Sequence, residues 1–121
     1  MKNLYISRDR YNELFYFCKQ YKDRENEINY LRGLDEITQD GMPRGNVISD
    51  TIFKKANKII HLRAKNELIE QAAIEADAYI YQSIIKNVTE GIPYEYMEVP
   101  CGRRQFYERR RLFFKILSEK R

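Results

Sequence analysis

Hydrophobic positions recur along the chain at the spacing of α-helices, starting near its first residues. The first stripe, at steps of three and four, consists of Tyr11, Leu14, Cys18 and Tyr21, and it continues after a charged interval with Ile28 and Leu31. With Ser7 as a capping residue, this pattern predicts one helix from about residue 8 to about residue 32. The stripe suits either a core or a dimer seam, and packing within its own domain is the commoner use.

A break follows in "DEITQDGMPRGNVISD" (residues 35–50), where two glycines and a proline lie close together. Ser49 and Asp50 are good N-cap types, so we expect the next helix to start near Thr51 and to extend to about Glu75. Asp77 is the next capping candidate, and the apolar positions after it predict a helix that ends at Gly91.

The end of the chain predicts two more helices of unequal length. Pro93 suits the first position of a short helix over residues 93–97, a tight turn covers residues 98–101, and a long helix follows. The core face of the long helix consists of Phe106, the aliphatic stem of Arg110, Phe113 and Leu117, widened by Leu112 and Ile116. Because no strand pattern of useful length occurs, we predict an all-α fold, a small helical domain of about four to five helices.

Positive charge is concentrated in the last helix. Residues 99–121 hold six Arg and two Lys against two Glu, a net charge of +6, although the whole chain of 121 residues carries only +4. The rest of the chain is therefore net negative, and the basic character belongs to one terminal segment.

The order of the last elements has the layout of a helix-turn-helix over about residues 78–118, whose second helix enters the major groove of DNA. With the phenylalanine face turned inward, the opposite surface and its flanks carry Arg103, Arg104, Tyr107, Glu108, Arg111 and Lys115. The early residues suit base contacts, because an Arg can bind guanine in bidentate fashion, whereas Lys115 suits phosphates or solvent. Glu108 either accepts a hydrogen bond from a cytosine amino group or forms an ion pair with a neighbouring arginine of the same helix. A charged helix face is also often only a solvated surface.

Two stretches resemble small phage-encoded regulators of the ArpU/RinA type. They are "MPRGNVISDTIFKKANK" and "VPCGRRQFYERRRLFFKIL", and the similarity covers about residues 40–60 and 85–118. Thr51 directly follows Asp50, without the proline often found between them in that family, and the helix before the turn is shorter than usual. The resemblance implies a sigma-factor-like helix-turn-helix and a transcriptional regulator of late or packaging genes. It points to Arg103, Arg104, Gln105, Phe106, Tyr107, Arg110 and Arg111 as the matching helix.

We therefore expect residues 1–39 to form an N-terminal long helix, as a core or oligomerisation element, and residues 40–121 to form the helical DNA-binding region, within one compact domain. The expected partner is double-stranded DNA, with host RNA polymerase and a homodimer or higher oligomer as further candidates. Two other functions stay open: a small DNA-packaging component resembling a small terminase subunit, and a helical protein–protein interaction module.

Enzymatic and membrane functions are not expected. The chain has no phosphate-binding glycine motif, no Ser/His/Asp group and no apolar stretch long enough to span a bilayer. Cys18, Cys101 and the single His61 lie at no familiar zinc spacing, so we expect no metal and no cofactor. The first residues lack the apolar segment of a secretory signal, which predicts a cytoplasmic location. The resemblance to phage regulators implies that this is the cytoplasm of a host bacterial cell.

Overall fold

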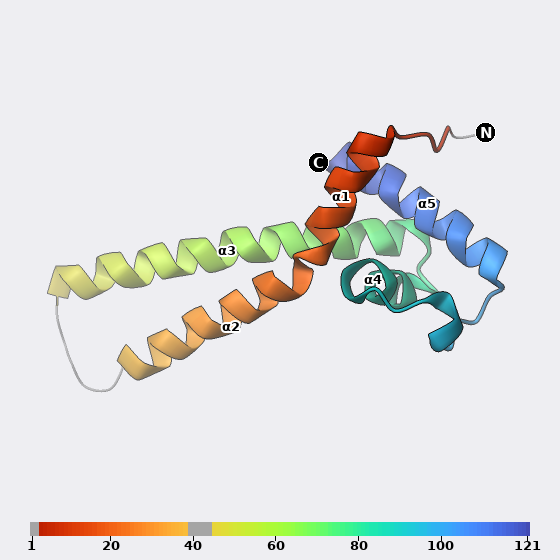
Figure 1. The fold of residues 1–121 in the computed structure, drawn as a ribbon. Coiled ribbons are helices and arrows are strands. Elements are labelled where there is room, and N and C mark those ends of the chain that lie inside the picture. Colours follow the sequence, from red (N-terminus) through yellow and green to blue (C-terminus); the bar gives the residue numbers. More distant parts are fainter. Residues whose placement is uncertain (1–2, 39–44) are drawn as a thin grey trace. The chain divides into compact units, whose positions relative to one another are not determined.

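The computed structural model describes residues 3–38 and 45–121, and within them the chain forms helices, turns and bends without a strand. The helices are α1 (Arg8–Lys19), α2 (Tyr21–Thr38), α3 (Gly45–Ala76), α4 (Tyr81–Glu90), the short 3-10 helix η1 (Tyr94–Tyr96) and α5 (Arg103–Lys120) (Figure 1). The all-α prediction is confirmed. The chain divides into two compact units, one of Met1–Lys22 with Glu67–Arg121 and one of Asp23–Asn66. The predicted division at residue 39 stays a prediction.

The predicted first helix is two helices, because the chain turns at Gln20 between α1 and α2. The Gln20 amide donates to the Phe17 carbonyl at 3.3 Å, and this bond closes a turn that is one residue shorter than an α-helical turn. The two parts of the stripe lie in different units: Leu14 is buried in the core of the first unit, and Ile28 is buried in the second unit. A straight helix from residue 8 to residue 32 is therefore wrong, although the assignment of the first stripe to a core is confirmed.

Helix α3 begins at Gly45, six residues before the predicted start at Thr51, so Ser49 and Asp50 do not cap it. The helices extend into the predicted loop of residues 35–50 from both sides, to Thr38 and from Gly45, since first helical turns accept Gly, Asn and Ser more readily than helix interiors do. The glycine and proline at positions 41 and 43 lie outside the described residues. The predicted end of this helix, near Glu75, agrees with the observed end at Ala76.

The core of the first unit is apolar and draws on α1, the C-terminal part of α3, α4 and α5 (Figure 1). Its most deeply buried large side chains are Leu14, Ile69, Ile84, Val88, Phe106, Phe113, Phe114 and Leu117. Burying aromatic and aliphatic side chains of this size contributes about 1.5–3 kcal/mol each, so α5 is fixed mainly through its three phenylalanines.

The second unit pairs residues of α2 with residues of α3 through polar contacts. Arg24 Nε donates to Asn66 Oδ1 at 2.6 Å, and both side chains are buried. Lys58 Nζ lies 2.7 Å from Glu27 Oε1. Since the earlier residue of α2 meets the later residue of α3, the two helices run antiparallel in this unit.

The path from α4 to α5 differs from the predicted helix-turn-helix. Gly91 ends α4 as predicted, with a φ of 72° that favours glycine. A single 3-10 turn, Tyr94–Tyr96, stands where a helix over 93–97 was expected, and α5 starts at Arg103 after an N-cap at Gly102. Asp77 does not cap α4; its Oδ1 accepts from the amides of Tyr79 and Ile80 in the preceding turn. A helix-turn-helix with a short turn is therefore not confirmed.

Candidate nucleic-acid interface

Helix α5 is anchored by one face, which leaves the opposite face to solvent. Phe106, Phe113 and Leu117 are fully buried, as their spacing predicted. Phe114 is buried as well, which the spacing did not predict, while Leu112 and Ile116 are only half-buried. Phe114 reaches the core because α1 lies beside it, where the Tyr11 and Phe114 ring centroids are 4.8 Å apart.

The seven predicted DNA-binding residues all lie on α5, within one 18-residue helix. Five of them are exposed, namely Arg103, Arg104, Gln105, Glu108 and Arg111, and two are half-buried, namely Tyr107 and Lys115. The structure therefore brings the candidates together along one helix but gives them different degrees of access to a ligand.

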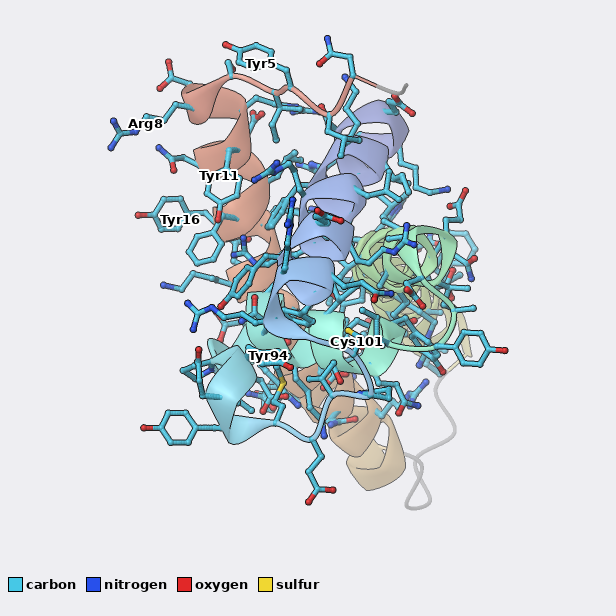
Figure 2. The ribbon with its side chains drawn as sticks, turned by 90° about the vertical axis from the view of Figure 1, so that its right-hand side faces the viewer. Tyr5, Arg8, Tyr11, Tyr16, Tyr94 and Cys101 are labelled. Atoms are coloured by element: carbon cyan, nitrogen blue, oxygen red, sulfur yellow. The ribbon has the colours of Figure 1, made fainter. Side chains whose placement is uncertain are left out.

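Arg103 is held against the segment that precedes the helix. Its Nη1 pairs with Glu95 Oε1 on η1, and its guanidinium lies over the Tyr107 ring at 5.4 Å from the centroid. Tyr94 closes the same segment, since its hydroxyl donates to the Cys101 carbonyl at 2.6 Å (Figure 2). The charge of Arg103 is therefore partly neutralised by Glu95, and its guanidinium is held in place against Tyr107.

Arg104 and Glu108 form an exposed pair one helical turn apart. Arg104 Nε lies 3.5 Å from Glu108 Oε1, and the two side chains are 94% and 61% exposed. An ion pair this exposed contributes little to stability, because water screens it. Of the two roles expected for Glu108, pairing with a neighbouring arginine is the one seen in this structure, and the pair leaves Arg104 available for exchange to a phosphate or a base.

Lys115 turns toward the N-terminal segment. Its Nζ donates to the Tyr5 carbonyl at 3.4 Å, so it lies toward the segment before α1. Arg109, the basic residue before Arg110, lies with its Nε 3.3 Å from Asp77 Oδ2. These two cations are therefore placed by contacts within the protein.

Arg110 has a larger role than the sequence indicated. Its Nε donates to Asn87 Oδ1 at 2.6 Å and its Nη2 donates to the Tyr11 hydroxyl at 3.0 Å. The guanidinium also lies over the Phe114 ring at 4.9 Å. The prediction that only its stem would contribute is wrong. Its partners lie 23 and 99 residues away in sequence, so no local pattern could have identified them.

The two cysteines and the possible metal ligands bear on metal and thiol chemistry. No group of three His, Cys, Asp or Glu side chains there could hold a metal ion. Cys18 is buried. Burial, with the negative charge of Asp77, raises the pKa of the Cys101 thiol, while the positive charge of Arg109 opposes the rise. A raised pKa makes a poorer nucleophile at neutral pH.

Residues 3–38 and 45–121 also contain no helix of the length and apolarity that a membrane crossing requires. No protein-family model, no curated protein and no solved structure matches the chain.

Proposed function

We propose that the chain is a DNA-binding regulator that reads double-stranded DNA with the exposed face of α5. The observation that supports this proposal is the division of α5 into a fully buried phenylalanine face and an exposed basic face. A major groove about 12 Å wide accepts one α-helix, and Arg and Gln side chains on such a helix match the hydrogen-bonding edges of guanine and adenine.

The proposal assigns different tasks to the residues of this face. Arg104 and Arg111 are exposed cations on α5, which suits base contacts; Gln105 between them suits adenine. Arg103, held by Glu95, suits a positioning contact to phosphate. The resemblance to ArpU/RinA-type regulators supports the further proposal that this function belongs to a phage or prophage and controls transcription.

The test is binding to a library of fragments of phage and prophage DNA. A regulator selects a site with a Kd on the order of 10⁻⁸ M and loses affinity steeply as salt rises. Arg104→Ala is expected to relax the preference at one base position by about 1–3 kcal/mol. The matched control is Lys86→Ala, an exposed cation on α4, which is expected to change neither affinity nor preference. Binding that is insensitive to both salt and Arg104→Ala contradicts the proposal.

A second candidate, assembly through α3, rests on apolar side chains exposed in the unit of residues 23–66. Ile52, Phe53 and Ile60 are 43%, 64% and 61% exposed. Such an exposed apolar group is typical of a surface that another chain covers. It favours a DNA-packaging component that forms an oligomer, or an interaction module, over a monomeric regulator. The mass in solution of the wild type and of Phe53→Ser distinguishes an assembly through α3 from a monomeric regulator, because only such an assembly dissociates in the variant.

A further inference from the structure

An open groove runs beside α5 in the unit of residues 1–22 and 67–121. It has a volume of about 820 Å³ and lies where the N-terminal segment and α1 meet α5. Its polar lining consists of Tyr5, Arg8, Tyr11, Tyr107, Arg110 and Arg111. The residues around the groove include three guanidinium groups and no carboxylate, so its chemistry favours an anion.

Two of the three arginines are available to a ligand. Arg8 and Arg111 are exposed, and neither makes an ion pair or a side-chain hydrogen bond with the residues that the structure describes. Arg110 is engaged by the neutral side chains of Asn87 and Tyr11, so its charge is not cancelled by a carboxylate. A phosphate in the groove therefore meets two unpaired cations and a third whose charge remains.

The aromatic lining supplies flat surfaces next to these cations. Tyr5 is 72% exposed, and Figure 2 shows Tyr5 and Arg8 extending outward from the N-terminal segment and the start of α1. Tyr11 lies against α5, where it contacts Phe114 and Arg110. Tyr107 contributes a third ring from α5. Aromatic rings beside a positively charged groove are the combination by which proteins bind unpaired nucleotides, because the base stacks on a ring and the phosphate meets a cation.

We propose that this groove binds an unpaired nucleotide of a DNA strand that continues from the duplex on α5. Tyr107 and Arg111 support this occupant, since they line the groove and also belong to the proposed duplex-binding face of α5. A base inside a duplex is stacked on its neighbours and offers no free face to Tyr5, whereas an unpaired base does. The inference rests on the proposed function, because it extends the same DNA surface from α5 to the N-terminal segment beside it.

The experiment compares two labelled DNA hairpins by fluorescence anisotropy, one blunt and one with a short single-stranded thymine overhang. The wild-type protein is expected to bind the overhang hairpin about tenfold more tightly, the gain from stacking one base and adding one phosphate contact. Tyr5→Ala and Arg8→Ala are expected to remove most of that gain and to leave blunt-hairpin binding nearly unchanged. The matched controls are Tyr79→Ala and Arg63→Ala, which replace an exposed tyrosine and an exposed arginine that do not line the groove.

Equal affinity for the two hairpins overturns the inference and leaves the proposed duplex binding intact. The inference is also overturned, with duplex binding intact, if Tyr5→Ala and Tyr79→Ala lose the tighter binding of the overhang hairpin to the same extent. Competition by free thymidine monophosphate as effective as that of the overhang overturns the assignment to a DNA strand. If instead only the overhang hairpin binds, and Tyr5→Ala and Arg8→Ala abolish that binding, the groove is supported and the duplex function fails.

Discussion

Arg110 of α5 donates to Asn87 of α4 through a hydrogen bond of 2.6 Å between Nε and Oδ1. The same asparagine donates through Nδ2 to the Ile92 carbonyl at 2.9 Å, just after α4 ends. Asn87 therefore joins the exit of α4 to the middle of α5, and Arg110 extends the link to Tyr11 on α1. This chain of contacts orients the helix whose exposed face carries the proposed DNA contacts.

Arg110→Ala is expected to lower the free energy of unfolding by about 2 kcal/mol, because it removes two hydrogen bonds from a charged donor and leaves Asn87 Oδ1 without this partner. Urea unfolding followed by far-ultraviolet circular dichroism measures the change. Arg104→Ala, an exposed arginine on the same helix, is the control and is expected to stay within about 0.5 kcal/mol of the wild type. Equal destabilisation by the two variants contradicts a structural role for the Arg110 guanidinium.

Gly91→Ala is expected to destabilise the protein by about 1 kcal/mol. The φ of 72° at Gly91 is unfavourable for an alanine, although a Cβ there meets nothing within 4 Å. Gly33→Ala is the matched control: a Cβ there is also in open space, but Gly33 lies within α2 and its φ is not positive, so alanine is expected to stabilise the protein by up to about 1 kcal/mol. Thermal unfolding of the two variants separates backbone strain from the mere addition of a methyl group, and a destabilisation by Gly33→Ala as large as that by Gly91→Ala contradicts the explanation.

The sequence predicted those elements whose boundaries depend on local chemistry. Gly91 ends α4 through its own conformational freedom, and the periodic spacing of Phe106, Phe113 and Leu117 identified most of the buried face of α5. Both signals are contained within a few neighbouring residues, and therefore one sequence is enough to read them.

Features that depend on tertiary contacts could not be predicted from local sequence patterns. The turn at Gln20 has neither glycine nor proline, and Leu14 before it and Ile28 after it are buried in different units. Phe114 is buried only because α1 covers a second side of α5. The groove beside α5 could not be predicted from the sequence either, because Tyr5 and Arg8 come from one end of the chain and Arg111 comes from the other.

Glu108→Gln distinguishes the two roles that the sequence left open for this residue. If Glu108 only pairs with Arg104, the variant frees that cation and removes a negative charge facing phosphates, so we expect affinity for every duplex to rise by about threefold to tenfold. If Glu108 accepts from a cytosine amino group, the preferred site alone loses affinity. Anisotropy titrations with the preferred and a scrambled duplex measure both outcomes, with Glu90→Gln on α4 as the control.

Cys101 is expected to react with iodoacetamide only at a pH above that of an ordinary thiol, because burial and Asp77 raise its pKa and the thiolate is the reactive form. Cys18 is fully buried, so the alkylation rate of the folded protein reports on Cys101. Asp77→Asn keeps an oxygen for the amides of Tyr79 and Ile80 but removes the negative charge, which lowers the midpoint of the rate–pH profile. Arg109→Gln removes the positive charge that opposes the rise in pKa, so the midpoint of the rate–pH profile moves up in this variant.

A midpoint that moves in the same direction in Asp77→Asn and Arg109→Gln contradicts this electrostatic account. Asp9→Asn, which replaces an exposed aspartate on α1, is the control and is expected to leave the midpoint unchanged.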